Sequence, residues 1–379
     1  MIRVLSLLFV LLIGSTALSR SFVLKQGSWE FRGHPVAYER ATGVSGPSSA
    51  APLLLLNGFG VGSFHQHKLV SELLKNDQYE ARSIYCIDYL GQGRSWPVDC
   101  QDGNGPTESG LRYCGSTWVQ QVLGFIEEVI IPEEGCSKVH IAGNSVGGHL
   151  AVFVAATRPD LVESLGLLNA TPVWGLNLPG WSGHLPAPVL PKLVGRYLFD
   201  KIRDLKTIEQ YLATAYVNRD AFDQDLMEQI RSCTTGSGGH AAFASIMWSP
   251  PITTTLPNQL ERVDFYGCLA SLQCDVLLLF GRDDPWCKPA IAQRMLRLLE
   301  GREGLVQRYV ELASVGHCPN HEAPKSVSKI LSAWLTDPRQ SMSAADCRVQ
   351  ESWGVAEFSE LTSEAIPTTF VDKLAASFL

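Results

Sequence analysis

Several kinds of segment are missing from this sequence of 379 residues, and each absence excludes a class of protein. After residue 13, no apolar run reaches the ~20 residues that a membrane-spanning helix needs. The 31 Lys and Arg residues are outnumbered by 38 Asp and Glu residues, so the net charge of -7 argues against nucleic-acid binding. Glycine and proline follow no fixed period and no segment repeats, which excludes collagen and solenoid architectures.

Cysteine is sparse for a disulfide scaffold, at ten residues in the whole chain. No two cysteines form a Cys-x-x-Cys pair, and none has the cysteine and histidine spacing of a zinc site. Cys100 and Cys114 flank the loop 101–113, so a local disulfide there is one alternative. Most of the other cysteines are interpreted as free buried thiols.

The first residues have the pattern of an address signal. Arg3 precedes a nearly unbroken apolar run over 4–13, and small residues follow it. This pattern predicts a signal peptide over 1–19, with an uncleaved anchor as the alternative. Residues 20–28 contain Arg and Lys but no acidic residue, which predicts a transit-like segment. A signal peptide alone predicts secretion, whereas the two segments in succession can address a plastid.

Short apolar runs alternate with helical patterns along most of the chain. The predicted strands are residues 53–56, 83–88, 138–142, 164–168, 275–280 and 306–312, and the predicted helices are residues 116–131, 146–157, 289–299 and 324–335. Continuous apolar strands separated by helices are typical of a parallel sheet that is covered on both faces. The sequence therefore predicts the α/β class, with a mostly parallel sheet flanked by helices.

The alternation stops over residues 173–264, where helical patterns stand between proline-rich ends and no good strand is evident. We interpret this segment as a helical cap inserted over the carboxyl edge of the sheet, where α/β sheets place their ligands. The core is then formed by residues 29–172 and 265–338. In residues 339–379 the alternation of strand and helix patterns stops, and we expect these residues to form a loosely packed C-terminal extension.

The clearest chemical motif is the segment GNSVGG at residues 143–148, which follows a predicted strand and opens a predicted helix. It is a G-x-S-x-G nucleophile elbow in the strand–turn–helix context that this motif requires. The turn is so sharp that the residues two positions from Ser145 must be small. Ser145 is therefore the candidate nucleophile, and the alternative is a glycine-rich turn whose serine only caps the helix.

Two further strand ends offer a base and an acid. His317 follows the last predicted strand, where it can reach the elbow and accept the Ser145 proton; His321 is the rival. The penultimate strand is followed by Asp283 and Asp284, and either carboxylate could orient an imidazole. We choose Asp284 because a proline fixes the turn directly after it, whereas Asp283 can form hydrogen bonds within the turn.

An oxyanion that develops next to the nucleophile needs N–H donors. Val146 follows Ser145, and its N–H lies at the start of a predicted helix, where the helix dipole favours negative charge. The glycine-rich loop 57–62 follows the first apolar strand, and we choose its Phe59 N–H as the second donor. Phosphate binding, the alternative for this loop, is disfavoured because the Lys-Ser/Thr of a P-loop is missing.

With these motifs the chain resembles the α/β-hydrolase superfamily and, more narrowly, the plant and algal pheophytinases and the chlorophyll dephytylases. The order Ser145, Asp284, His317 is the chain order of α/β-hydrolases. The segments that carry the resemblance are LNGFGVGSFH at 56–65, IDYLGQG at 87–93, GNSVGG at 143–148, LLNATPVW at 167–174, FASIM at 243–247, GRDDPW at 281–286 and GHCP at 316–319. The resemblance implies the α/β-hydrolase fold with an inserted helical cap.

The resemblance also implies a function, namely cleavage of the phytyl ester of a chlorophyll-type pigment, pheophytin to pheophorbide plus phytol, without metal or cofactor. The partner would be this hydrophobic ester substrate, with peripheral contact to plastid membranes, and the first residues would be a chloroplast address. In the cap, Trp174, Phe243 and Met247 would bind the substrate, or else pack the cap's own core. The alternatives are a general carboxylic-ester or lipid hydrolase, an acyltransferase on the same triad, and a non-catalytic ligand receptor.

Overall fold

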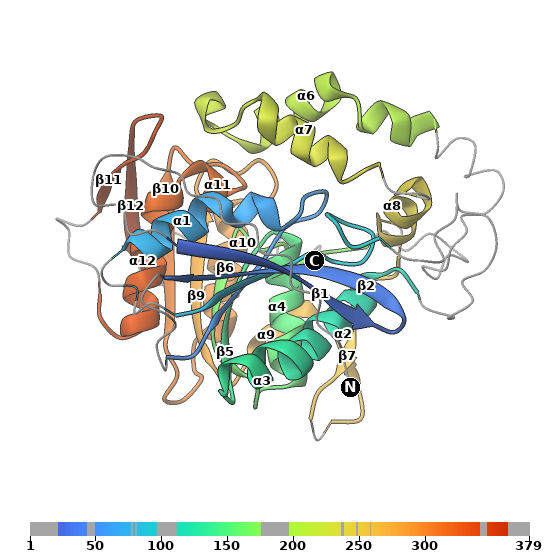
Figure 1. Cartoon of the computed structure of the whole chain (residues 1–379). Coiled ribbons are helices and arrows are strands. Elements are labelled where there is room, and N and C mark those ends of the chain that lie inside the picture. Colours follow the sequence, from blue (N-terminus) through green and yellow to red (C-terminus); the bar gives the residue numbers. More distant parts are fainter. Residues whose placement is uncertain are drawn as a thin grey trace.

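A ten-stranded sheet forms the centre of the molecule, with the strand order β1-β2-β4-β3-β5-β6-β9-β10-β12-β11 (Figure 1). The computed structural model describes residues 22–43, 50–76, 79, 82–96, 112–175, 197–235, 239–247, 249–257, 259–341 and 347–362. The strands of the sheet are β1 (Phe22–Phe31), β2 (His34–Gly43), β3 (Leu53–Leu56), β4 (Ile84–Ile87), β5 (Val139–Asn144), β6 (Val162–Leu168), β9 (Asp275–Gly281), β10 (Gln307–Ala313), β11 (Arg348–Gln350) and β12 (Val355–Leu361). The strands from β4 to β10 in this order are parallel. The outer pairs are antiparallel.

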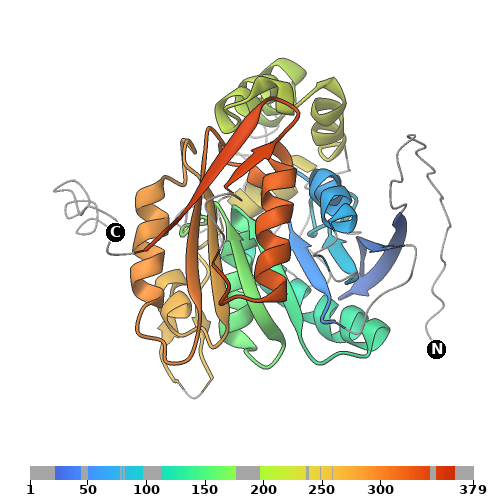
Figure 2. The same ribbon diagram turned by 90° about the vertical axis from the view of Figure 1, so that its left-hand side faces the viewer.

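Helices cover both faces of this sheet, as Figures 1 and 2 show. The helices around and above the sheet include η1 (Ser63–Gln66), α1 (His67–Lys75), α2 (Gly115–Phe125), η2 (Ile126–Ile130), α3 (Ile131–Glu134), α4 (Val146–Thr157), α6 (Leu205–Ala215), η3 (Arg219–Ala221), α7 (Gln224–Ser232), α8 (Gly239–Met247), α9 (Phe265–Ala270), α10 (Pro289–Leu299), α11 (Pro319–Glu322) and α12 (Pro324–Thr336). Of these, α6, η3, α7 and α8 belong to the predicted cap. The predicted α/β fold class is confirmed by this arrangement.

The side chains of β3 show why the apolar runs predicted strands correctly. Leu54 and Leu56 belong to the core cluster that contains residues of α2, α4, α9 and α10. Leu53 and Leu55 belong to a second cluster, together with residues of α1 and α12. Because successive side chains of a strand point to opposite faces, a strand that is buried on both faces must be apolar throughout. All six predicted strands are confirmed, as β3, β4, β5, β6, β9 and β10.

Residues 22–28 of the predicted transit-like segment are part of the sheet, and their role as an address stays a prediction. These residues lie in β1, which pairs with β2 along its whole length through a turn at Arg32 and Gly33. Side chains of β1 alternate between half-buried and exposed, so the strand is polar on one face and does not form an apolar run. The core therefore begins before residue 29. The predicted signal peptide over 1–19 lies outside the described residues.

The expectation that the C-terminal extension is loosely packed is wrong for Arg348–Leu361. These residues form the hairpin β11–β12, and β12 pairs with β10 at the edge of the sheet (Figure 2). Phe358 is buried in the second core cluster, and Arg308 of β10 forms an ion pair of 2.6 Å with Glu360. The hairpin thus covers an edge of β10 that would otherwise present unpaired backbone groups.

Of the predicted cap, residues 173–264, the helices α6 and α7 lie above the sheet in Figure 1. Residues of α6 and α7, with the segment that joins them, form their own small apolar cluster. A two-stranded pair, β7 (Thr254–Thr255) with β8 (Arg262–Val263), also lies in this segment, where no strand was expected. Among the described residues, no helix is long and apolar enough to cross a membrane. Cys100, one half of the alternative disulfide with Cys114, lies outside the described residues.

Shortening the chain after Ser341 should destabilise the fold, because β10 loses its neighbour and Phe358 no longer fills its place in the core. We expect the free energy of unfolding to fall by about 3 kcal/mol or more, the usual effect of losing a buried aromatic side chain. Denaturant unfolding would measure the change. A chain shortened after Thr362 is the matched control, since it keeps the hairpin. Equal stability of the two shortened chains would contradict the structural role of β11–β12.

Candidate active site

The elbow between β5 and α4 holds Ser145 in a strained backbone conformation. Its φ of 54° and ψ of -118° are rare for a residue with a Cβ and cost about 1–3 kcal/mol. Glycines make the turn possible, since a Cβ at Gly143 would lie 2.4 Å from the backbone of Gly147. A Cβ at Gly147 would lie equally close, 2.4 Å, to the carbonyl oxygen of Leu56. The side chain of Ser145 is therefore presented at the carboxyl end of β5.

The loop after β3 lies against this serine. A Cβ built at Gly58 would be 3.5 Å from the Ser145 Cβ, so Phe59 directly follows a residue that touches the elbow. The N–H of Gly60 donates to Gln92 Oε1 at 2.7 Å, and this hydrogen bond helps to hold the loop in place. Val146 begins α4, as expected. The arrangement suits two backbone donors near Ser145, and their role as an oxyanion hole stays a prediction.

His317 and Asp284 are directly hydrogen-bonded. The distance from His317 Nδ1 to Asp284 Oδ2 is 2.6 Å, and both side chains are largely buried. Asn144, the neighbour of Ser145, donates from Nδ2 to the His317 carbonyl oxygen at 2.8 Å, so the histidine loop is attached to the elbow. The ends of β5, β9 and β10 thus bring the predicted nucleophile, acid and base to the same edge of the sheet.

Asn169, at the end of β6, orients the carboxylate of Asp284. Its Nδ2 donates to Asp284 Oδ2 at 2.8 Å, and its Oδ1 accepts from the Gly281 N–H, also at 2.8 Å. Asn169 is fully buried and has a positive φ of 42°. Asparagine tolerates this backbone region better than most residues. Sequence reasoning missed this residue, although a polar side chain directly after a buried strand was the available signal.

The pKa of Asp284 is lowered from its usual value. Burial by itself would raise this pKa, but the hydrogen bond and charge of His317 outweigh it, together with the N–H groups of Trp286 and Cys287. The Trp286 N–H donates to Asp284 Oδ1 at 2.7 Å. The carboxylate is therefore ionised at neutral pH and accepts hydrogen bonds on both oxygens, as an imidazole-orienting acid must.

Neither rival residue, Asp283 or His321, belongs to the hydrogen-bonded pair of His317 and Asp284. Asp283 is exposed and accepts the N–H of Ser314, which directly follows β10, at 2.9 Å, so its hydrogen bond leaves its own turn, and Asp284 alone of the pair faces His317. His321 is buried on α11, with its ring stacked 4.8 Å from that of His65. Burial, together with the charges of His65 and Lys68, lowers the pKa of His321.

Aromatic side chains gather around Phe59. Its ring lies 4.9 Å from that of Trp174 and 5.0 Å from that of Phe243, which itself lies 5.5 Å from Phe199. The Trp174 Nε1 atom is buried and has no hydrogen-bond partner within the described ranges. Met247, the third predicted substrate contact, ends α8, the helix that carries Phe243. These groups form an apolar wall beside the elbow.

A network of charged residues fixes the start of η1, which follows the loop 57–62. Asp88 accepts the N–H groups of Ser63 and Arg94, at 2.6 and 2.9 Å. Arg94 also donates to Glu39 at 3.0 Å, and the same carboxylate lies 2.6 Å from His67 Nε2. These residues line a polar hollow next to α7. They hold in place the residues that directly follow the loop 57–62.

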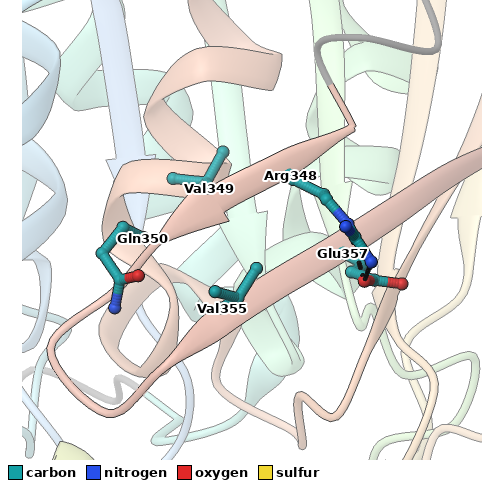
Figure 3. Close-up of a pocket in the computed structure, with 5 residues that line it drawn as sticks. All are labelled: Arg348, Val349, Gln350, Val355 and Glu357. Carbon is teal, nitrogen blue, oxygen red and sulfur yellow. Dashed lines mark hydrogen bonds and ion pairs between the residues drawn. The ribbon is translucent and has the colours of Figure 1, made fainter.

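Another hollow lies on the β11–β12 hairpin and is lined by Arg348, Val349, Gln350, Val355 and Glu357 (Figure 3). Arg348 and Glu357 form an ion pair across it. None of the predicted site residues belongs to it.

One group among the described residues offers three potential metal ligands. Ligand atoms of Asp284, Cys287 and His317 lie within 4.8 Å of one another. The hydrogen bond of 2.6 Å between Asp284 and His317 already accounts for the closeness of two of them.

The chain is similar in sequence to known hydrolases. Residues 53–330 match the sequence profile of the Alpha/beta hydrolase family. "Pheophytinase, chloroplastic" of Arabidopsis thaliana is 30% identical over 325 residues, which cover 76% of this chain and 61% of that protein. "Pimeloyl-[acyl-carrier protein] methyl ester esterase" of Neisseria meningitidis is 27% identical over 179 residues, 47% of this chain and 62% of that protein. Both matches therefore span less than two thirds of the length of the relative.

Solved structures of low sequence identity share the fold. A thermophilic esterase from Thermogutta terrifontis superposes with a TM-score of 0.54 at 18% identity, over 81% of this chain and 95% of that one. A membrane phospholipase A superposes with a TM-score of 0.56 at 21% identity, over 84% and 87% of the two chains.

Replacing Asn169 with glycine removes a donor to Asp284 without adding backbone strain. The pKa of Asp284 should rise towards its usual value, because fewer groups stabilise the carboxylate. A lowered pKa contributes stability above the unfolded-state value of about 4, and this contribution disappears as the pH falls. We therefore expect a loss of about 1–2 kcal/mol at pH 7 and a smaller loss near pH 3, measured by denaturant unfolding.

Ser314→Gly is the matched control for this substitution. Ser314 also has a positive φ, of 59°. Its backbone N–H donates to Asp283 and its C=O accepts from Asn218, and both groups remain in the variant. Similar losses in both variants at both pH values would contradict the role of the Asn169 side chain.

Proposed function

Because the chain belongs to the alpha/beta hydrolase family, we propose that it is a serine hydrolase acting on carboxylic esters. In this proposal Ser145 is the nucleophile, His317 the base and Asp284 the acid that orients the base. The observation that carries it is the 2.6 Å hydrogen bond between His317 and Asp284, on a loop that Asn144 ties to the elbow of Ser145. The esterases among its relatives support the same reaction class.

The proposed reaction has two steps. Ser145 attacks the ester carbonyl while His317 accepts its proton, and the N–H groups of Phe59 and Val146 stabilise the oxyanion. The alcohol leaves with a proton from His317. Water then attacks the acyl-enzyme by the same route and releases the acid. Asp284 stays ionised throughout and stabilises the imidazolium, in keeping with its lowered pKa.

For the substrate we propose the phytyl ester of a chlorophyll-type pigment, with pheophytin as the preferred form. The similarity to the chloroplastic pheophytinase supports this choice. The apolar wall of Phe59, Trp174 and Phe243 also supports it, since a long isoprenoid chain gains about 0.8 kcal/mol for each CH₂ that it buries. The proposal includes a plastid location and peripheral contact with plastid membranes, where such a substrate is found.

Substitutions at the three triad positions and at their neighbours test the reaction. We expect Ser145→Ala, Asp284→Asn and His317→Asn to lower kcat on a short soluble ester by about 10³-fold or more. The neighbouring changes Asp283→Asn and His321→Asn should keep most of the activity, because neither side chain faces His317. A fluorophosphonate probe should label Ser145 only in chains with an intact triad. Full activity of Ser145→Ala would refute the nucleophile assignment.

Chromatography of pigments after incubation with the purified protein tests the substrate. Pheophytin should yield pheophorbide, and Phe243→Ala should raise KM for pheophytin about tenfold by removing part of the apolar wall. Phe222→Ala is the control, because its ring packs on Tyr216 inside the cap. Cleavage of simple long-chain esters but not of pheophytin would favour a general ester or lipid hydrolase. Ester transfer to an added alcohol would favour an acyltransferase.

A further inference from the structure

The cap forms direct hydrogen bonds with the loop that carries His317. The His317 N–H donates to the carbonyl oxygen of Ala215, the last residue of α6, at 2.7 Å. Asn218 follows α6, and its Nδ2 donates to the Ser314 carbonyl oxygen, also at 2.7 Å. The approach of the two segments is so close that a Cβ at Gly316 would lie 2.2 Å from the Ala215 oxygen. The loop can therefore take this position only with a glycine before His317.

Glu322, on α11, joins these two segments with a single carboxylate. Its Oε2 accepts the Gly316 N–H at 2.7 Å, directly before His317. Its Oε1 accepts both the N–H and the Nδ2 of Asn218, each at 2.8 Å. The two oxygens thus serve different partners, one on the His317 loop and one on the cap. Glu322 is 1% exposed, so water cannot replace a lost donor without a change in structure.

The carboxylate is itself held by the surrounding structure. Glu322 lies on a short helix whose carbonyl group at this residue accepts Trp353 Nε1 from the β11–β12 hairpin, at 2.6 Å. Trp353 packs against both the cap cluster and the core cluster of α1 and α12. Glu322 therefore has little freedom to follow a moving partner, and its position is set by the core.

We propose that Glu322 is a positioning residue that couples the docking of the cap to the placement of the His317 imidazole. The inference rests on the proposed function, since it assigns to His317 the role of base. When the cap is docked, Ala215 and Glu322 fix the backbone on both sides of the Gly316–His317 peptide. When the cap is displaced, the loop loses its hydrogen bonds to Ala215 and Asn218 at once, and Glu322 loses its Asn218 donors and keeps only the Gly316 N–H. Small displacements of a catalytic group reduce the rate strongly, because proton transfer depends on distance and alignment.

Glu322→Gln tests the proposal with almost no change in shape. A glutamine has one acceptor oxygen and one NH₂ group, so its NH₂ must face either the Gly316 N–H or the Asn218 donors. One of the two links is therefore lost. We expect kcat on a short soluble ester to fall by about tenfold to a hundredfold, with KM changing less than about twofold. Asn218→Ala should lower kcat in the same direction but less, because the backbone N–H of the residue remains.

Glu351→Gln is the matched control. Glu351 is also a buried carboxylate that accepts several donors, the N–H and Oγ of Ser326 at 2.7 Å and the Lys325 N–H at 3.4 Å. These donors belong to α12 and its start, so this carboxylate holds the hairpin and not the His317 loop. Both variants should lose thermal stability, but only Glu322→Gln should lose activity at a temperature where both are folded.

Amide hydrogen exchange provides a readout that does not need catalysis. In Glu322→Gln, exchange should become faster in both the 215–218 and the 314–317 segments, and in Glu351→Gln in neither. Unchanged kcat, or faster exchange in only one of the two segments, would overturn the coupling. If the unmodified protein hydrolyses no ester, the proposed function fails while exchange still shows whether Glu322 couples the cap to the loop.

Discussion

Asp284 is a carboxylate that is buried and yet ionised, and the rest of the site depends on this constraint. Burial alone would neutralise it, so the protein must supply hydrogen-bond donors from several directions. They come from His317 after β10, from Asn169 after β6 and from the backbone of Trp286 after β9. The strands that supply them, β6, β9 and β10, are neighbours in the sheet. The requirement of one charge thus fixes the relative positions of three strand ends.

The cap and the C-terminal hairpin extend this arrangement outwards. Glu322 accepts hydrogen bonds from the cap on its side chain and one from the hairpin on its backbone, so the described cap helices are attached to the loop that carries His317, the proposed base. The loop 57–62 and the residue after it are held in a comparable way by Gln92 and Asp88. Polar contacts thus hold both the His317 loop and the loop after β3, and the apolar wall lies around Phe59 of the latter.

Much of this could be predicted from the sequence, because buried parallel strands are apolar throughout and polar residues then mark their ends. That signal identified all six central strands and placed Ser145, Asp284 and His317 at one edge. It failed for β1, where half-buried and exposed side chains alternate, and for β11 and β12, which follow the last helix without an apolar run. The partners Asn169 and Glu322 were missed because hydrogen bonds between distant segments leave no local pattern. Which of Asp283 and Asp284 faces inwards depends on the turn itself.

The positive φ of Ser145 limits which residues could replace this proposed nucleophile. Threonine carries the same hydroxyl group, but its branched Cβ is poorly compatible with that region of backbone space. Cysteine and aspartate are unbranched at Cβ and meet no such barrier. A change of reaction class at this elbow is therefore more accessible, in evolution or by engineering, than the exchange of one alcohol for another.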